Sequence, residues 1–297
     1  MVPLFSVIMP AHNEEDTIEA ALRSISAQTE KNFEIIVVND GSTDNTSKVI
    51  EEYQKKEPRL RLVISNPKGT SAAHARNEGA WQAKGTYLLF HDADCEADPC
   101  LLNNAAKLLD DYDIDGVATR TSNTKPKSWI QHAVATQRSI RWENTVRQNM
   151  RPIMLDADSK VNVAIMYRDC FEHLGGFNED IFYFEDNDLT KRFFDSGNVA
   201  MFDRDVIQYH QDPLTLKESI GQCKSIAKGM KKKGGPTLKE AAMFLFALYG
   251  LINFLPFIIL FAYMYWKSRD ARGSFYFATL WEIRTIAKLY YLVTLRK

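Results

Sequence analysis

Hydrophobic positions along the first 119 residues follow two alternating periods. Brief apolar runs that stop at proline or at polar residues have the length of buried strands; they are Phe5–Pro10, Glu34–Val38, Arg61–Ile64 and Leu88–Phe90. Between the first two runs, Ile18, Leu22 and Ile25 recur at helical spacing behind the candidate caps Asn13 and Asp16. The other expected helices are Asn45–Lys56 and Ser71–Ala83. This alternation predicts right-handed crossovers and an α/β fold with a mostly parallel sheet flanked by helices.

Polar residues gather where the predicted strands end. Ligands of such sheets bind at the carboxyl ends of the strands, and three polar segments follow these ends: residues 10–14, 39–44 and 91–94. In an extended chain Asp92 and Asp94 point the same way, so both carboxylates can reach a hard cation such as Mg²⁺ or Mn²⁺. The alternative interpretation of Asp92 and Asp94 is a solvated turn that binds no cation. Arg76, from the third crossover, adds a cation suited to a diphosphate.

The segment after residue 120 predicts further elements and a second acidic cluster. A strand over Val161–Met166 precedes a short helix that ends at Gly175. Glu185, Asp186 and Asp188 then begin a helix, whose dipole tolerates acidic groups in its first turn. Neighbouring helical side chains diverge by about 100°, so Glu185 and Asp186 are expected to have different roles. Residues 129–146 predict a helix with a packing role, and a strand over 206–207 leads to His210.

Composition excludes several classes of protein. A chain of 297 residues with 45% hydrophobic and 25% charged residues is not disordered, and it fits one large domain with an appendage. No Walker loop or Gly-x-Gly-x-x-Gly occurs, which argues against the usual ATPases and dinucleotide-binding enzymes. The four cysteines form no Cys-x-x-Cys pair, and no cationic segment with a long apolar run opens the chain. We therefore expect a reducing, cytosolic site.

The last 74 residues differ from the rest in charge and hydropathy. Residues 224–297 hold thirteen Lys and Arg against three Asp and Glu, although the formal net charge of the whole chain is only −1. Within them Ala241–Trp266 carries no charge, and 26 helical residues span about 39 Å, enough to cross a bilayer. The alternative is a buried helix broken at Asn253 and Pro256. Phe275–Leu295 predicts an interfacial helix. We expect a membrane-associated tail after a catalytic body of residues 1–223.

The order of four motifs carries a family resemblance. Ser6–Glu14, Val37–Thr46, Ala75–Asn77 and Asp92–Asp94 resemble the successive signatures of family 2 glycosyltransferases, which have the GT-A fold. The resemblance implies a nucleotide-binding half over residues 1–119 and an acceptor half over 120–223. It also implies a site made of donor-binding residues, a divalent cation held by carboxylates, and a catalytic base. Those residues are Pro10, Asn13, Glu14, Asp40, Arg76 and Asp92 for the donor, Asp92, Asp94 and His210 for Mn²⁺ or Mg²⁺, and Asp186 as the base.

The resemblance and the tail together predict a membrane-associated, inverting glycosyltransferase. Its donor would be a nucleotide sugar, most simply a UDP- or GDP-sugar, and its acceptor a lipid-linked molecule or a glycan, with the catalytic domain facing the cytoplasm. The glutamine and basic run typical of processive synthases is absent near Gln222, so transfer of one sugar per encounter is expected. Alternatives are a sugar-phosphate nucleotidyltransferase and a non-catalytic membrane scaffold of the same fold. Nucleic-acid binding is disfavoured because the basic residues of the tail flank apolar runs.

Overall fold

The described part of the chain forms two compact units. The computed structural model describes residues 2–65, 71–123, 127–136, 153–155, 162–181, 184–212, 215–221, 223, 261–263, 275, 278–279 and 281. The first unit combines residues 1–122 with 148–211, and the second combines 123–147 with 212–297. The first unit contains the sheet and every candidate site residue. The predicted division of the chain at residue 223 stays a prediction.

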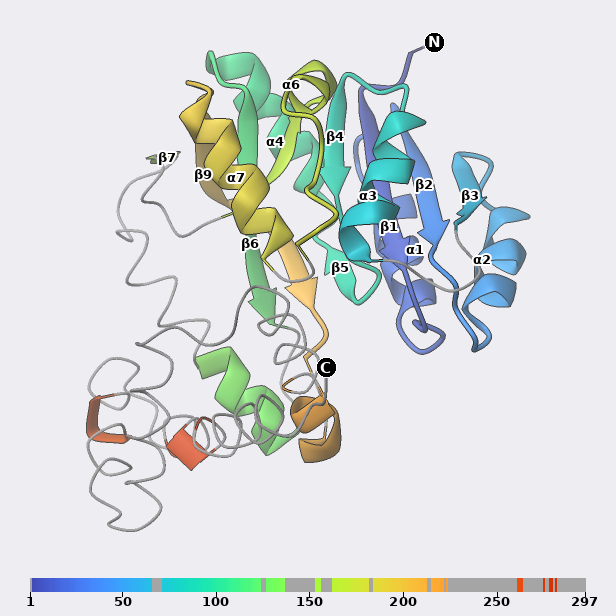
Figure 1. Cartoon of the computed structure of the whole chain (residues 1–297), viewed down its shortest axis with the longest axis vertical. Coiled ribbons are helices and arrows are strands. Elements are labelled where there is room, and N and C mark those ends of the chain that lie inside the picture. Colours follow the sequence, from blue (N-terminus) through green and yellow to red (C-terminus); the bar gives the residue numbers. More distant parts are fainter. Residues whose placement is uncertain are drawn as a thin grey trace. The chain divides into compact units, whose positions relative to one another are not determined.

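Four parallel strands form one half of the sheet in the first unit (Figure 1). They are β1 (Phe5–Ala11), β2 (Phe33–Asn39), β3 (Leu60–Ile64) and β4 (Tyr87–Phe90). Their order is β3-β2-β1-β4, and in this register Val7 of β1 lies between Ile35 of β2 and Leu89 of β4. The crossovers predicted from the sequence therefore give the expected parallel arrangement, which aligns the carboxyl ends of β1, β2 and β4.

The other half of the sheet is antiparallel where its pairing is described. Its strands are β5 (Cys95–Ala97), β6 (Gly116–Asn123), β7 (Ile153–Leu155), β8 (Val163–Tyr167) and β9 (Ala200–His210). The full order is β3-β2-β1-β4-β8-β6-β9-β5, with β7 also on β9. The pairs β4–β8, β6–β8, β5–β9 and β7–β9 are antiparallel. The result is a mixed sheet in which β9, late in the sequence, returns beside β5 and so reaches the region of Asp94.

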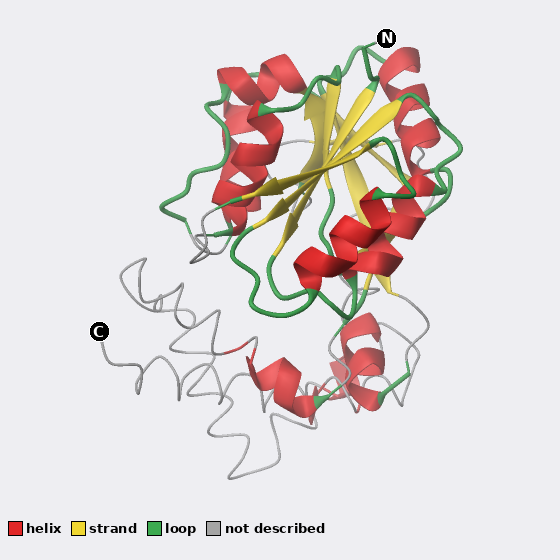
Figure 2. Ribbon diagram, turned by 90° about the vertical axis from the view of Figure 1, so that its right-hand side faces the viewer, coloured by secondary structure: helices red, strands yellow, loops and turns green. Residues whose placement is uncertain are grey.

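Helices cover both faces of this sheet (Figure 2). They are α1 (Ile18–Ser26), α2 (Thr46–Gln54), α3 (Ala72–Trp81), α4 (Leu101–Asp111), α6 (Arg168–His173) and α7 (Glu185–Asp195). Phe5, Val7 and Met9 of β1 pack in one cluster with α1, α2 and α4, whereas Ile8 packs in another with α3, α6 and α7. Side chains alternate in this way because strands have a period of two. Burial on both faces explains why β1 appears in the sequence as an unbroken apolar run.

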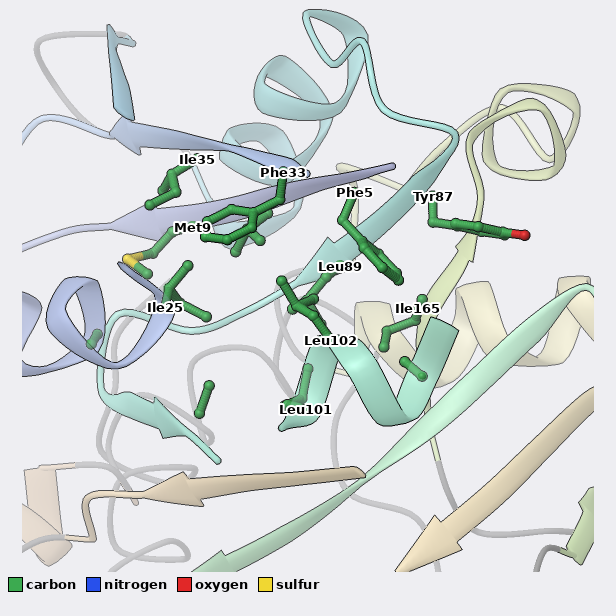
Figure 3. Packing of buried hydrophobic residues seen from close by; sticks show 14 of the residues in the cluster. Phe5, Met9, Ile25, Phe33, Ile35, Tyr87, Leu89, Leu101, Leu102 and Ile165 are labelled. Carbon is green, nitrogen blue, oxygen red and sulfur yellow. The ribbon is translucent and has the colours of Figure 1, made fainter. Parts of the chain in front are cut away.

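The core of the first unit is built from large apolar side chains in close contact. Phe5, Met9 and Leu89 come from neighbouring strands, and Leu101 and Leu102 of α4 point toward the same cluster (Figure 3). All five are completely shielded from solvent, and each such side chain stabilises the fold by about 1.5–3 kcal/mol relative to exposure. The helices are thereby held firmly against the strands whose ends carry the site.

Helix α3 approaches β1 more closely than a larger residue would permit. A Cβ added at Gly79 would lie 2.6 Å from Ile8 Cγ2 and 3.1 Å from Val38 Cγ2. Glycine at this position therefore lets α3 lie directly on β1 and β2, at a cost in helix propensity of about 1 kcal/mol relative to alanine. This close packing fixes the distance of Arg76, one helical turn earlier, from the strand ends.

The predicted caps of α1 are wrong. Thr17 is the residue before the helix, and it makes no side-chain cap hydrogen bond. Asn13 has a left-handed backbone with φ of 58°, and its side-chain Oδ1 accepts hydrogen bonds from Thr43 N at 2.8 Å and Thr43 Oγ1 at 3.2 Å. Its side-chain amide therefore connects the loop after β1 to the loop after β2 and does not cap the helix. Sequence spacing alone did not indicate this contact.

The second unit has a small apolar cluster of its own. Helical residues 129–136, the described part of the helix predicted over 129–146, contribute Ile130, Ala133 and Val134. Trp129, Leu216 and Trp281 pack against them. Residues 241–260 and most of 275–295, where a spanning helix and an interfacial helix were predicted, lie outside the described residues. Among the residues that the structure does describe, no helix is both long enough and apolar enough to cross a membrane.

Candidate functional site

A cavity of about 200 Å³ opens at the carboxyl ends of β1, β2 and β4. It is lined by Pro10, Ala11, His12, Glu14, Asp40, Ala72, Ala75, Arg76, Asp92, Ala93 and Asp94. The structure thus brings together five of the six residues predicted for donor binding, Asp92 among them, with the predicted metal ligand Asp94. Asn13 is not among the lining residues, and it lies beside them in the loop described above. The strand-end rule therefore predicted the convergence of these residues, and their roles stay predictions.

The loops after β1 and β2 are joined across the cavity wall by His12. Its Nδ1 donates to the backbone oxygen of Asp40 at 2.7 Å, and its Nε2 accepts from Asn13 Nδ2 at 3.2 Å. Asp40 N in turn donates to Ala11 O at 2.9 Å. Asp40 is only 5% exposed. These contacts hold its backbone in one position at the wall of the cavity.

Glu14 places a carboxylate at the same wall. Thr17 Oγ1 donates to Glu14 Oε2 at 2.7 Å, and the backbone N–H of Glu14 donates to Thr46 Oγ1 at 2.8 Å. Burial raises the pKa of Glu14, and the charges of Asp94 and Asp92 raise it further, whereas the Thr17 hydroxyl opposes them. The cavity therefore concentrates negative charge, which a bound cation would neutralise.

Arg76 links the two acidic clusters of the sequence. Its Nη2 donates to Asp92 Oδ1 at 2.7 Å and its Nη1 donates to Glu185 Oε1 at 2.6 Å. The guanidinium lies over Phe177, 5.4 Å from the ring centroid. Burial alone would lower the pKa of Arg76, but the charges of Asp92 and Glu185 outweigh it and raise the pKa. Arg76 is therefore a permanent cation that fixes one carboxylate from the loop after β4 and one from the start of α7.

Asp92 and Asp94 lie in a turn, not in the extended chain that the spacing argument assumed. Cys95 N donates to Asp92 O at 3.0 Å, which closes the turn, yet both aspartates line the cavity. Burial would raise the pKa of Asp92, but the charge and hydrogen bond of Arg76 outweigh it and lower the pKa. Asp94 contacts a different partner, because its Oδ2 lies 3.2 Å from His210 Nε2. The two carboxylates thus line the same cavity but have different partners. Asp92 is held by the guanidinium of Arg76, and Asp94 by the imidazole of His210.

His210 reaches Asp94 because β9 pairs with β5. His91, which the sequence places among the polar groups after β4, supports this arrangement from inside. It is fully buried, and its ring nitrogens lie 2.7 Å from Gln208 Oε1 and 3.0 Å from Cys95 O. Burial lowers the pKa of His91. His91 therefore has a structural role beneath the site, whereas His210 faces the carboxylates.

Asp186 begins α7 beside Glu185. Phe184, immediately before the helix, has a left-handed backbone with φ of 67°, a conformation that is strained for an aromatic residue and common near functional sites. Asp186 Oδ2 accepts a hydrogen bond from Asn162 Nδ2, and its Oδ1 accepts from Asn187 N at 2.8 Å. Burial, followed by the charge of Glu185, raises the pKa of Asp186. A carboxylate in this state is suited to accept a proton.

Asn77 fastens α3 to the segment before α7. Its Nδ2 donates to Phe177 O at 2.9 Å and to Glu179 Oε1 at 2.8 Å, and its Oδ1 accepts from Phe177 N at 2.8 Å. His74, on the same helix, lies 2.9 Å from Glu179 Oε2 through its Nδ1. Asn77 and His74 of this helix thus contact the segment before α7, Asn77 through the backbone of Phe177 and both through the side chain of Glu179. Lys68, a further cation near this crossover, lies outside the described residues.

Sequence reasoning missed three residues of the site. His12 and Cys95 each stand next to a motif residue but matched no expected role, and Glu185 was set aside in favour of Asp186. Only the sheet order shows that Cys95 faces His210, since the two are 115 positions apart in the sequence. For Glu185 the signal was present in the divergence of neighbouring helical side chains. That divergence sends one carboxylate of the pair to Arg76 and the other to Asn162.

Solved structures of low sequence identity share this fold. The mannosyltransferase PcManGT from Pyrobaculum calidifontis, solved in complex with GDP-Man and Mn²⁺, aligns with a TM-score of 0.62 and 21% identity over 100% of this chain and 89% of that one. TarS 1-349 of S. aureus in complex with UDP-GlcNAc aligns with a TM-score of 0.57 and 22% identity over 76% of this chain and 66% of that one. Likeness at this identity shows the fold, and it confirms the predicted GT-A type of sheet.

Sequence comparisons show the family. The uncharacterized glycosyltransferase EpsJ of Bacillus subtilis (strain 168) is 28% identical over 222 residues, which cover 73% of this chain but only 64% of that protein. Glycosyltransferase AglE of Haloferax volcanii is 27% identical over 263 residues, or 86% of this chain and 82% of that protein. The sequence model of glycosyl transferase family 2 matches residues 6–174, which include β1 through α6. The chain therefore belongs to glycosyl transferase family 2, the family and enzyme class that the order of its motifs predicted.

Proposed function

We propose that the chain transfers a sugar from a nucleoside diphosphate sugar to an acceptor hydroxyl or phosphate at the cavity between β1, β2 and β4. The observation that carries this proposal is the convergence of Asp40, Arg76, Asp92 and Asp94 on one cavity at the strand ends. Two proteins of the same fold were solved with such donors, one with UDP-GlcNAc and one with GDP-Man and Mn²⁺. A UDP- or GDP-sugar is therefore the donor class to test first.

The acidic wall of the cavity fits a divalent cation. Asp92, Asp94 and His210 offer two carboxylates and an imidazole, a donor set that suits Mn²⁺ and is compatible with Mg²⁺. Burial is the main cause of the raised pKa of Glu14, and the nearby charges of Asp94 and Asp92 raise it further, which is consistent with an acidic wall that favours a cation. A bound cation would supply positive charge for the donor diphosphate. On this proposal Asp94 and His210, already 3.2 Å apart, hold the cation together with Asp92.

The chain's own residues would then divide the remaining tasks. Asp40, buried at the wall, contacts the base or ribose of the donor. Arg76 keeps Asp92 in place and adds a fixed positive charge beside the leaving diphosphate. Asp186 accepts the proton of an acceptor hydroxyl as that oxygen attacks the anomeric carbon, and the nucleoside diphosphate leaves with the bonding electron pair. A single displacement of this kind inverts the anomeric configuration. For a phosphate acceptor, which has no proton to lose, Asp186 would orient the acceptor instead.

Membrane association and the acceptor extend the proposal. The support is the sequence of residues 224–297, with its excess of ten positive charges and the uncharged run Ala241–Trp266. We propose that this tail holds the body at the cytoplasmic membrane face, where a lipid-linked molecule or a glycan accepts one sugar per encounter. Sedimentation of the full chain with anionic vesicles tests this part. Recovery of all the protein in the supernatant at low salt would contradict it.

Donor binding is tested by thermal unfolding of the full chain with UDP-, GDP- and dTDP-sugars, each with and without Mn²⁺. The correct donor stabilises the folded state by mass action, by about 2.7 kcal/mol at one hundred times its dissociation constant. Asp94→Asn should lose the Mn²⁺-dependent part of this protection, whereas Asp111→Asn, at the exposed end of α4, should retain it. Transfer is then measured by release of the nucleoside diphosphate. Pyrophosphate release from a nucleoside triphosphate and a sugar phosphate would instead indicate a nucleotidyltransferase.

A further inference from the structure

Three different kinds of metal ligand meet beside the cavity. Asp94, Cys95 and His210 each place a ligand atom within 4.8 Å of the other two. Asp94 Oδ2 lies 3.2 Å from His210 Nε2, and Asp94 Oδ1 lies 3.6 Å from Cys95 Sγ. The sequence motifs predicted the aspartate and the histidine at this place but gave no role to the cysteine.

The sheet brings this cysteine and histidine together. Cys95 is the first residue of β5 and His210 is the last residue of β9, and the two are directly opposed in the antiparallel pair. Directly opposed residues place their side chains on the same face of a sheet, with Cβ atoms about 4.5–5.5 Å apart. Asp94 precedes Cys95, and its backbone oxygen accepts from Gln211 N at 2.9 Å. Strand pairing therefore fixes Cys95 and His210, and a backbone hydrogen bond next to this pair holds Asp94 at the end of its turn.

The chemistry of the cluster is that of a zinc site. Carboxylate and imidazole also suit Mn²⁺, but a thiolate selects softer ions, Zn²⁺ above all. Structural and catalytic zinc sites hold sulfur at about 2.3 Å and nitrogen or oxygen at about 2.0–2.2 Å in tetrahedral geometry. Ligand atoms around such an ion lie about 3.3–3.7 Å apart, and here one ligand atom from each residue lies within 4.8 Å of the other two. The contacts of 3.2 and 3.6 Å involve different oxygens of Asp94, so its carboxylate must rotate to bring one oxygen toward both partners.

We propose that Asp94, Cys95 and His210 bind Zn²⁺ through one oxygen, one sulfur and one nitrogen, with the fourth position open to water. Binding displaces the thiol proton of Cys95 to solvent, as thiolate ligation requires. The site shares Asp94 and His210 with the cation of the proposed function, and on that function the two ions exclude each other. Zinc then inhibits sugar transfer, because it draws both shared ligands toward Cys95.

The ligation itself is tested on the full wild-type chain with Co²⁺, a spectroscopic substitute for zinc. Cobalt bound by a thiolate shows a charge-transfer band in the near ultraviolet, which added Zn²⁺ should abolish. Bound cobalt without that band would overturn the proposal. This measurement needs no donor, no acceptor and no variant, so its result is independent of the proposed function. If no sugar were transferred, the proposed zinc site would be unaffected. If cobalt bound without the thiolate band, the proposed sugar transfer would be unaffected.

Variants then test whether Cys95 supplies the sulfur ligand. Competition with a chromophoric chelator gives the Zn²⁺ affinity, which Cys95→Ser should lower at least about tenfold, the lower limit for losing even a supporting group of a metal site. Cys100→Ser changes another cysteine that forms no disulfide; it is the matched control and should bind Zn²⁺ like the wild type. Equal loss in both variants, or none in Cys95→Ser, would refute the assignment. Circular dichroism confirms that each variant is folded before its affinity is interpreted.

Discussion

Replacing Arg76 with methionine removes the cation that joins Asp92 to Glu185 but keeps an unbranched apolar side chain beside Phe177. In the wild type the guanidinium donates to both carboxylates at 2.6–2.7 Å. Its own side chain is 11% exposed, that of Glu185 is 12% exposed, and that of Asp92 is 49% exposed. The two carboxylates therefore respond differently when the cation is removed.

The size of the effect follows from this difference in exposure. Removing one member of a buried ion pair costs about 3–5 kcal/mol, because the other charge stays in poorly solvated surroundings. Glu185 is in that position, but its residual exposure places the cost at the lower end. Asp92 is half exposed, so water replaces its partner and the loss there is small. We expect Arg76→Met to lower the free energy of unfolding by about 3 kcal/mol at pH 7.

Urea unfolding followed by circular dichroism measures this loss, provided that the slopes of wild type and variant agree. Lys191→Met is the matched control, since Lys191 and Asp195 form an exposed pair on α7 that should contribute less than about 1 kcal/mol. The double variant Arg76→Met with Glu185→Gln should recover at least about 1 kcal/mol, because it no longer buries an unpaired charge. A loss in Arg76→Met no larger than in the control would refute the reasoning.

The effect should also depend on pH with a defined sign. Arg76 lowers the pKa of Asp92 in the folded state, so the stability that this pair contributes is present above the ordinary aspartate pKa. It is lost as pH falls through the lowered pKa of the folded state. The difference between wild type and Arg76→Met should therefore shrink in acid. A difference that grows as the pH falls would show that the carboxylates are not its cause.

Three further substitutions test the site and its support. Thr46→Val keeps the shape of a fully buried side chain but leaves Glu14 N without its acceptor. Thermal unfolding should therefore show that the free energy of unfolding falls by about 1–2 kcal/mol, whereas the control Thr29→Val, at an exposed position, should be nearly neutral. Gly79→Ala should destabilise by about 1 kcal/mol net, since overpacking against Ile8 outweighs the gain in helix propensity; a stabilised variant would contradict the close approach. Asp186→Asn should abolish transfer yet raise the melting temperature at pH 7, because the raised pKa of Asp186 makes its ionised form unfavourable. This gain should disappear near about pH 3, where aspartates are protonated in both states, and an equal gain at both pH values would exclude charge as its cause.

The sequence predicted the parallel half of the fold because each strand there is a local pattern. The runs in β1, β2 and β4 place apolar side chains in both core clusters, whereas β3, at the edge of the sheet, is only partly buried. The first run is followed by α1, whose buried residues recur at helical spacing. The antiparallel half depends instead on which distant strands pair. Nothing local in Cys95 or His210 indicates that β5 and β9 are neighbours, so the pairing that completes the site appeared only in the structure.

The candidate site shows the same division between local and distant information. Asp40, Asp92 and Asp94 follow strands, and their convergence could be predicted from the alignment of parallel strand ends. The partners of Arg76 could not be predicted, since its contact with Glu185 joins residues 109 positions apart. The caps expected at Asn13 and Asp16 failed for a related reason. A short polar side chain has several possible partners, and the loop after β2 supplied a better one for Asn13 than the helix did.

The buried carboxamide of Asn77 has a consequence for the order of folding. It bonds both backbone groups of Phe177, exactly one hundred positions later in the chain. Contacts of such long sequence separation form slowly, because the intervening chain must first be ordered. During synthesis the first four strands leave the ribosome well before Phe177 exists, and chains of this size commonly fold through intermediates. The half of the sheet formed by β1–β4 is thus expected to acquire its fold first, and Arg76 stays solvated until Glu185 has been synthesised and packs against it.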